Sequence, residues 1–342
     1  MWTGRLPEEQ MLANTAVNWA GERWTMLLWP LPEHPRRRRA LVLHESWHRV
    51  QDRIGLPALA AGNEHLDELE ARLWLLLEWR ALRAALTGFG ERRARAASDA
   101  VAFRRRRQTL YPKALADEPA LELNEGLAEY TGIRLSSDSD SEAAEEAARR
   151  LEGAPREASF VRSFAYATGP AYGLLLDAAS HGWQRRLTAA DDLAELLARA
   201  MGLDGTGADV RAGLYGASEL RTSEARREKE RQARLARYRE RLVHGPLLLL
   251  PLEKPSASFD PRELVPLPGH GTVYPKLQAS DVWGVLEVSH GALLSPDWKQ
   301  LTVPAPAGPE ALSGDGWQLR LRPGWRLVPG ARGGDFRLAR EP

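Results

Sequence analysis

A His-Glu-x-x-His pattern is formed by His44, Glu45 and His48. On an α-helix, residues four positions apart lie on the same face, so the two imidazoles can reach one metal ion. This pattern is typical of zinc sites in which the glutamate accepts a proton from water. Pro35 before the pattern and Gly55 after it suit the start and the end of a helix. We therefore expect a buried helix that binds Zn2+ through His44 and His48, with Glu45 as the general base.

A catalytic zinc site needs a third protein ligand and one open position. Residues 51–55 read Gln-Asp-Arg-Ile-Gly, which excludes the metzincin spacing of a third histidine close behind the first two. Two acidic segments could supply a glutamate or aspartate instead, residues 64–68 and residues 123–130. In the first segment, Asp67 or Glu68 would be the ligand.

We favour the second segment because Glu125 and Glu129 are four residues apart on one expected helix. Glu125 can then bind the metal while Glu129 accepts a hydrogen bond from the far nitrogen of a zinc-bound imidazole, that of His44. Gly126 allows a close approach to another helix. Asn124, directly before Glu125, is expected among the residues that surround the ligands.

Residues 124–130 read Asn-Glu-Gly-Leu-Ala-Glu-Tyr and resemble the Asn-Glu-Gly-x-Ala segment of the gluzincin metallopeptidases. The resemblance is strongest to zinc aminopeptidases and thermolysin-like enzymes. In that family the glutamate before the glycine is the third zinc ligand, and a carboxylate four residues later orients a zinc-bound histidine. The resemblance therefore implies these two roles for Glu125 and Glu129.

Residues 166–176 are similar to the aminopeptidase stretch Tyr-x-x-Gly that is followed by an apolar helix. The tyrosine of that stretch stabilises the oxyanion of the tetrahedral intermediate, so the resemblance implies this role for Tyr166 or, alternatively, Tyr172. A strand expected at residues 23–29 stands where the family's substrate-binding edge strand would stand. The order along the chain is thus that of the family.

The resemblance covers about residues 20–180, and the chain departs from the family in three ways. The separation of His48 and Glu125 is much longer than in those aminopeptidases, so residues 56–115 are expected to form a helical insertion. No Gly-x-Met-Glu-Asn segment precedes the zinc pattern, so recognition of a free amino terminus is not supported. The tail of the chain has no counterpart in the family.

Hydrophobic periodicity predicts a mainly helical region up to residue 244. Residues 12–20 are expected to form a short helix or a loop. Helices are expected at residues 64–86, 92–110, 120–134, 142–151, 159–180, 189–201 and 219–242. From residue 245 onward, Pro- and Gly-rich turns separate short apolar or alternating runs, as in a small sandwich or barrel.

The predicted fold class is therefore α+β. A mainly helical, thermolysin-like zinc-peptidase domain at residues 1–244, with a small sheet near the zinc helix, would precede a small all-β domain at residues 245–342.

The amino-acid composition limits the classes of partner that the protein could bind. The formal net charge is only +1 over 342 residues, which argues against binding to nucleic acid. The arginine runs at residues 36–39 and 104–107 are expected to be solvated helix faces. Cysteine is absent, so any metal must be bound by histidine and carboxylate. No apolar run could span a membrane, and the N-terminus lacks the features of a signal peptide. We expect a soluble protein, cytoplasmic unless a leader has been removed.

These features together predict a zinc metallopeptidase that acts on a peptide or protein substrate. The alternative is a non-catalytic binding or regulatory protein on a peptidase-like fold that is stabilised by zinc. Glu45 argues against this alternative, because a structural zinc site needs no general base and closes its fourth position.

Overall fold

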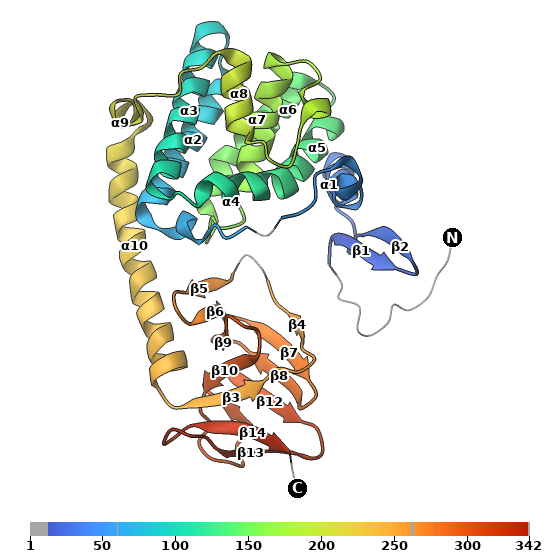
Figure 1. Ribbon diagram of the computed structural model, residues 1–342, viewed down its shortest axis with the longest axis vertical. Coiled ribbons are helices and arrows are strands. Elements are labelled where there is room, and N and C mark those ends of the chain that lie inside the picture. The colour runs from blue at the N-terminus through green and yellow to red at the C-terminus, as the bar shows by residue number, and fades with distance from the viewer. Residues whose placement is uncertain (1–12, 60, 261–262, 341–342) are drawn as a thin grey trace. The chain divides into compact units, whose positions relative to one another are not determined.

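The computed structural model describes residues 13–59, 61–260 and 263–340, and the chain divides into two compact units. One unit covers Leu12–Arg226 and the other continues from Arg227, so the division lies inside helix α10 (Ala217–Arg239). The first unit is mostly helical, and the second is built mainly of strands (Figure 1). The predicted order of a mainly helical part followed by a β-rich part is confirmed. The N-terminal residues on which the signal-peptide argument rests lie outside the described residues.

The first unit is a helical assembly around one apolar core. Its helices are α1 (Pro35–Val50), α2 (Leu69–Thr87), α3 (Gly90–Leu110), α4 (Ala114–Leu121), α5 (Leu127–Ser136), α6 (Asp140–Gly153), α7 (Ala165–Ala179), α8 (Leu193–Met201) and α9 (Ala208–Arg211). A π-helical turn, Glu122–Gly126, joins α4 to α5, so that α4, this turn and α5 form one continuous helical path. The helix expected at residues 64–86 is divided, because a separate 3-10 turn, Glu64–Asp67, precedes α2.

Helix α1 begins where the sequence predicts. Pro35 occupies its first turn, where the missing N–H has no partner to lose. After α1, a 3-10 turn ends at Gly55, whose φ of 82° lies in the left-handed region that glycine adopts at no steric cost. Helix α1 packs against α5 and against a two-stranded hairpin.

That hairpin consists of β1 (Thr15–Trp19) and β2 (Glu22–Met26), paired antiparallel. The turn residues Ala20 and Gly21 both have positive φ, as a tight two-residue hairpin requires. The prediction of a helix or loop at residues 12–20 is therefore wrong for the residues of β1. The expected small sheet near α1 is present and has two strands.

One arginine run departs from expectation. Arg104 and Arg107 are 1% and 0% exposed and form ion pairs with buried carboxylates, whereas Arg105 lies partly at the surface. The prediction of a solvated face at residues 104–107 is therefore wrong. Residues three apart lie on the same side of a helix, so a charge run winds around α3 and part of it points inward.

The second unit is a two-sheet β structure. Its strands are β3 (Leu247–Pro251), β4 (Ser256–Ser258), β5 (Val265–Leu267), β6 (Gly271–Tyr274), β7 (Leu277–Asp281), β8 (Gly284–Val288), β9 (Ala292–Leu294), β10 (Gln300–Pro304), β11 (Ser313–Gly314), β12 (Trp317–Leu321), β13 (Trp325–Pro329) and β14 (Phe336–Arg340). The seven-stranded sheet has the order β13-β14-β3-β10-β9-β6-β5, and the five-stranded sheet has the order β11-β12-β8-β7-β4. Side chains from both sheets share one apolar core, as in a sandwich. Strand β14 runs parallel to β3, and the other pairings are antiparallel among the described residues.

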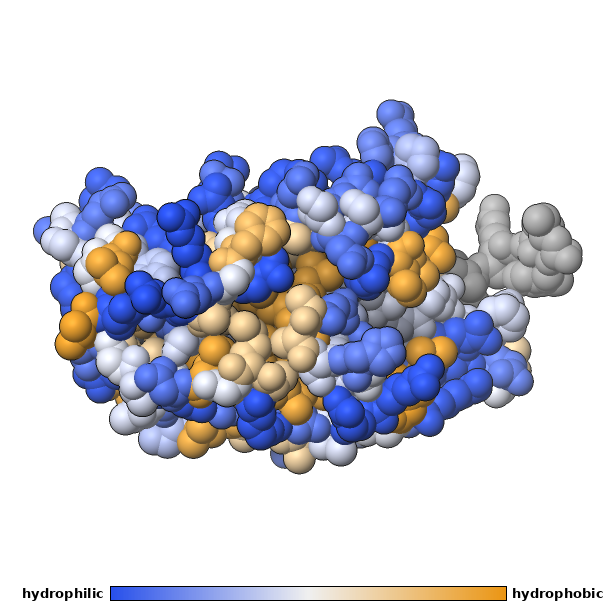
Figure 2. Space-filling model, turned by 90° about the horizontal axis from the view of Figure 1, so that it is seen from above, coloured by the Kyte–Doolittle hydropathy of each residue, from blue (hydrophilic) through white to orange (hydrophobic). Residues whose placement is uncertain are grey.

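The surface carries both hydrophilic and apolar residues. Figure 2 shows apolar side chains gathered in the middle of one face, bordered by hydrophilic ones. None of the helices in the described part of the chain has the length and apolar character needed to cross a bilayer.

Candidate metal centre

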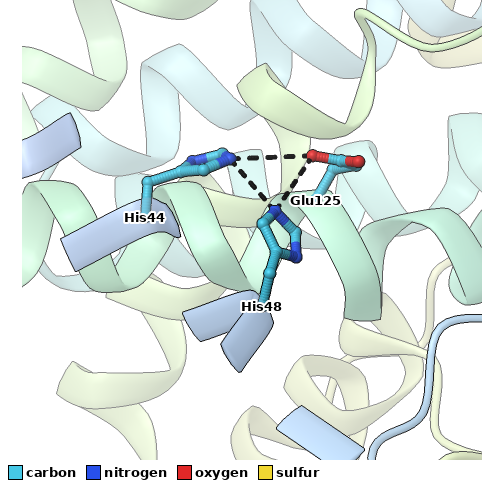
Figure 3. A group of neighbouring side chains, drawn as sticks. All are labelled: His44, His48 and Glu125. Carbon is cyan, nitrogen blue, oxygen red and sulfur yellow. Dashed lines mark hydrogen bonds and ion pairs between the residues drawn. The ribbon is translucent and has the colours of Figure 1, made fainter. Parts of the chain in front are cut away.

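Three potential metal ligands converge on one point in the helical unit (Figure 3). The Nε2 atoms of His44 and His48 are 3.3 Å apart, and each lies 3.6 Å from Oε2 of Glu125. Two ligand atoms bound to zinc at about 2.1 Å, with a tetrahedral angle between them, lie about 3.4 Å apart. The three atoms therefore have the separations that one tetrahedrally coordinated ion would require. Three protein ligands leave one position for another molecule.

The two elements that carry these ligands are held close together. His44 and His48 lie one above the other on α1, and Glu125 lies in the π-helical turn before α5. Gly132 of α5 packs against the backbone of Ala40 in α1, where a Cβ atom would lie only 2.8 Å from the carbonyl oxygen. A side chain at that position would push α5 away from the histidines.

The second nitrogen of each imidazole has its own partner. Nδ1 of His44 lies 2.8 Å from Oε2 of Glu129, the contact that the sequence predicts. Nδ1 of His48 lies 3.1 Å from Oε1 of Gln51, and Gln51 in turn donates to Oδ1 of Asn124 at 3.0 Å. With the proton on Nδ1, each Nε2 presents its lone pair to the centre of the cluster.

Both carboxylate oxygens of Glu125 also accept hydrogen bonds from the segment that leads into α7. The Tyr166 hydroxyl donates to Oε2 at 2.6 Å, and Arg162 donates to Oε1 at 3.0 Å. The Tyr166 ring lies parallel to the His44 ring, with centroids 5.7 Å apart. The structure thus brings Tyr166 to the cluster, with its hydroxyl at the same oxygen that faces the histidines.

The pKa values of His44 and Glu125 are shifted in opposite directions. Burial alone would lower the pKa of His44, but hydrogen bonds to Glu125 and Glu129 raise it to about 9. Burial would raise the pKa of Glu125, whereas hydrogen bonds from His44, His48 and Tyr166 hold it well below its ordinary value. A proton therefore stays on the imidazole when no cation is bound. A metal ion must displace that proton, so metal binding competes with protonation.

Glu45 lies beside the ligands and is not one of them. Its side chain is buried, and among the described residues its carboxylate has no hydrogen bond or ion pair. Burial raises the pKa of Glu45, while the positive charge of His44 and His48 would lower it. A buried carboxylate without a partner is costly, which sets Glu45 apart from the other carboxylates of the cluster.

Other residues that the sequence offered for the site lie away from the three candidate ligands. Tyr172 is fully buried and donates its hydroxyl to Glu78 at 2.6 Å, so the structure does not bring it to the cluster. In the alternative acidic segment, the Asp67 carboxylate accepts from the backbone N–H of Phe160 at 2.9 Å. Asp67 therefore ties its segment to the chain before α7, and the cluster contains neither Asp67 nor Glu68.

Three residues of the site were not singled out from the sequence: Gln51, Arg150 and Arg162. Gln51 follows His48 by three residues, so helical spacing could have identified it. Arg150 of α6 forms an ion pair with Oε1 of Glu129 at 2.6 Å, and Arg162 reaches Glu125 from the segment before α7. No local signal marks these two arginines, because only the tertiary fold brings them near the ligands.

The close approach to another helix that is expected at Gly126 is made to α7. A Cβ atom on Gly126 would lie 3.0 Å from the Ala165 carbonyl oxygen and from Cα of Gly169, both in α7. A Cβ on Gly169 would lie 2.3 Å from Cα of Gly126. The π-helical turn and α7 are therefore in direct backbone contact, and Tyr166, on the same face of α7 near its start, is held close to Glu125.

A separate pocket of about 1250 Å³ opens between the ends of α2, α5, α6 and α7. The Asp177 carboxylate lines it and accepts hydrogen bonds from Tyr130, Trp183 and Gln184 at 2.7–2.9 Å. None of the three candidate ligands lines this pocket. Its carboxylate is already saturated by neighbouring donors, so we assign it no chemistry.

Comparisons with known proteins add no relative. The chain matches no protein family, and no curated protein or solved structure shows a significant similarity to it.

Proposed function

We propose that the protein is a zinc-dependent hydrolase, and specifically a metallopeptidase of gluzincin type. His44, His48 and Glu125 would bind the metal through atoms that already have the separations of a tetrahedral site. A zinc ion in such a site supplies Lewis acidity and lowers the pKa of water to near neutrality. The hydrogen-bonded Nδ1 atoms of both imidazoles fit this role, because they leave each Nε2 free to bind.

The buried, unpartnered carboxylate of Glu45 among the described residues is the main support for a hydrolase. Two histidines and one carboxylate also bind iron in oxygenases, so the ligand set alone does not define the reaction. A buried carboxylate beside the ligands, with no partner among the described residues, is what a proton acceptor for water needs to be. The same group would return the proton to the leaving amine.

Tyr166 would supply a hydrogen bond to the oxyanion that forms when water attacks a peptide carbonyl. Its hydroxyl already lies at the edge of the cluster, 2.6 Å from Glu125. Burial and the charge of Glu125 raise the pKa of Tyr166 well above its ordinary value, so that the hydroxyl stays protonated and can donate. We assign no such role to Tyr172.

A peptide or protein substrate is proposed because residues 124–130 and 166–176 resemble the gluzincin metallopeptidases. The runner-up is a zinc-stabilised binding or regulatory protein. It accounts for the three ligands but gives no reason for a buried carboxylate that has no partner in the described part of the chain.

Metal analysis and one substitution test the proposal. Purified protein should contain one zinc per chain, as opposed to iron, and should cleave members of a broad peptide library. Glu45→Gln should retain the zinc and the helical circular dichroism spectrum and lose about 10²- to 10⁴-fold in cleavage rate, since it removes only the proton acceptor. Full activity in Glu45→Gln would overturn the mechanism. Bound zinc with no cleavage by the wild-type protein would favour the binding protein.

A further inference from the structure

Four glutamates lie along the helical path from α4 to α5, at positions 118, 122, 125 and 129. In an uninterrupted α-helix each residue turns the path by about 100°. The four side chains would then fall within about 60° of one another and form a single acidic stripe. Like charges so placed would repel, and all four would face the same neighbours.

In the structure these glutamates face two different groups of residues. Glu118 and Glu122 contact arginines of α3, whereas Glu125 and Glu129 contact the histidines of α1. The change occurs at the π-helical turn, where the N–H of Leu127 bonds to the carbonyl of Glu122. This turn holds one residue more than an α-helical turn, so it rotates everything after it by about 100°.

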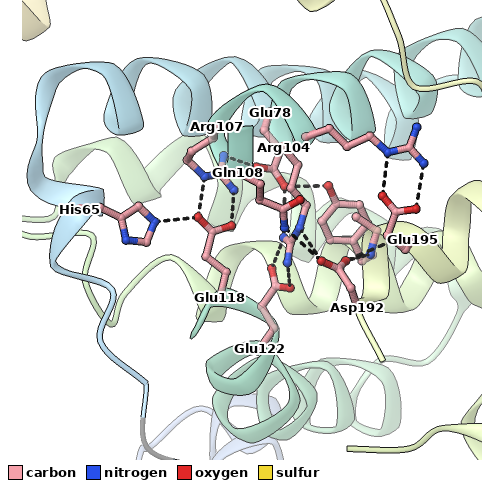
Figure 4. Close-up of polar contacts among 12 residues, drawn as sticks. His65, Glu78, Arg104, Arg107, Gln108, Glu118, Glu122, Asp192 and Glu195 are labelled. Carbon is pink, nitrogen blue, oxygen red and sulfur yellow. Dashed lines mark hydrogen bonds and ion pairs between the residues drawn. The ribbon is translucent and has the colours of Figure 1, made fainter. Parts of the chain in front are cut away.

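The first pair of glutamates is held by two-pronged ion pairs in the core (Figure 4). Arg104 donates to both oxygens of Glu122 at 2.9 and 2.7 Å, and Arg107 donates to both oxygens of Glu118 at 2.7 Å. All four side chains are at most 1% exposed. A planar guanidinium that binds a carboxylate with two parallel bonds fixes orientation as well as distance.

The arginines are themselves anchored to other elements. Arg107 also donates to Glu78 of α2 at 2.6 Å, and Arg104 pairs with Asp192, the N-cap of α8, at 3.1 Å. The rotation of α4 about its own axis is therefore defined relative to α2, α3 and α8. The direction in which Glu125 points then depends on the number of residues in the turn that follows.

We propose that the pairs Arg104–Glu122 and Arg107–Glu118 are positioning groups for the metal centre. They hold the first two glutamates in place and make the π-helical turn the stable register, and this register directs Glu125 and Glu129 at α1. The inference rests on the proposed metal site, although neither arginine contacts a ligand.

A substitution in the first pair tests this inference. Glu122→Met keeps the length and helix propensity of the side chain and removes its bonds to Arg104. The matched control is Glu195→Met, because Arg105 of the same helix binds Glu195 of α8 through two bonds, at 2.7 and 2.8 Å, with no contact to the π-helical turn. The measurements are the zinc affinity and the visible absorption spectrum of the Co2+-substituted protein, neither of which depends on a substrate.

We expect Glu122→Met to weaken zinc binding by about 10- to 100-fold and to alter the Co2+ spectrum, as changes around metal ligands do. Glu195→Met should leave both unchanged. Glu122→Gln, which keeps a hydrogen-bonding group, should fall between the wild type and Glu122→Met, and it decides the question if the methionine variant does not fold.

Two results separate the failure of this inference from that of the proposed function. If the wild-type protein binds neither zinc nor Co2+, the metal centre itself is wrong and the inference falls with it. If the wild type binds zinc, and the folded Glu122 variants match Glu195→Met in affinity and spectrum, only the positioning role is overturned.

Discussion

Two buried polar clusters lie on the same helical path, and they are built largely from the same residue type. Around Glu118 and Glu122, each carboxylate faces guanidinium donors at 2.6–2.9 Å. Around Glu125, two imidazole nitrogens and a carboxylate oxygen face one another at 3.3–3.6 Å. The first arrangement pairs donors with acceptors, and the second gathers three atoms that can all act as electron-pair donors.

The difference shows what makes a buried acidic cluster able to bind a metal. Arginine brings five N–H donors and no acceptor, so it neutralises the charge of a carboxylate without adding a lone pair that could bind a cation. Histidine can give its one proton to an outside partner, here Glu129 or Gln51, and then present a lone pair inward. The ability to bind a metal thus depends on the histidines and on the partners of their Nδ1 atoms, and both clusters contain glutamates.

The largest difference between the clusters should come from removing one carboxylate of each. Glu125→Ala should abolish stoichiometric zinc binding and leave the fold intact. Glu118→Ala should leave Arg107 in the core without its two-pronged partner and lower the free energy of unfolding by about 3–5 kcal/mol. The folded variant should still bind one zinc ion, with an affinity lowered to the same degree as that of Glu122→Met. Zinc content and urea denaturation measure the two effects. Full zinc binding by Glu125→Ala would remove this residue from the ligand set.

Each cluster also holds one tyrosine, which gives a second comparison. Tyr166→Phe should reduce the cleavage rate by about 10²- to 10³-fold, since it removes a donor to the oxyanion. Tyr172→Phe should leave the rate constants of the folded protein unchanged, and should lower stability by about 1–3 kcal/mol because Glu78 loses a donor. Rates and thermal unfolding of both variants check this. Equal rate losses in the two would contradict the assignment of Tyr166 to the reaction.

A smaller effect is expected from the partner of the first histidine. Glu129→Gln removes the charge that orients His44 through Nδ1, and should weaken zinc binding by about 10- to 100-fold without abolishing it. Competition with a chelator measures the affinity. An unchanged affinity would show that the contact between Glu129 and His44 does not contribute to metal binding.

The smallest expected effect is a pH dependence of the unfolding free energy that comes from Glu118 in the cluster around Glu118 and Glu122. Burial would raise the pKa of Glu118, but the charge of Arg107 and the hydrogen bonds from Arg107 and His65 hold it well below its ordinary value of 4.5. A lowered pKa contributes stability that is present above 4.5 and is lost as the pH falls through the pKa of the folded state. In metal-free protein, the difference in unfolding free energy between wild type and Glu118→Gln should therefore shrink below about pH 4.5. A difference that grows as the pH falls would reverse the sign of this contribution.

Local spacing predicts part of this site and misses the rest for identifiable reasons. The four-residue spacing of His44 and His48, and of Glu125 and Glu129, places each pair on one face, and the structure contains the expected contact between Glu129 and His44. The π-helical turn has no such signal, because plain α-helical spacing would place Glu122 on the same stripe.

The inward arginines were missed, and the predicted β-rich unit was divided into its individual strands only in part, for a related reason. Arg104 and Arg107 read as solvated charge, since burial of an arginine depends on carboxylates from other elements. The alternating run of β12 predicts a strand, whereas short strands such as β9 are defined mainly by their neighbours.

The parallel pairing of β14 with β3 bears on the order in which the molecule is made. Strand β3 begins with four leucines, Leu247–Leu250, and is bordered on one side by β10 and on the other by β14 at residues 336–340. During synthesis the residues of the helical unit, Leu12–Arg226, emerge from the ribosome before those of the β strands. The leucine strand, by contrast, leaves the ribosome long before its last neighbour exists. Until then one edge of β3 is an unpaired, apolar template for other chains, so the nascent chain is most prone to aggregate at this strand.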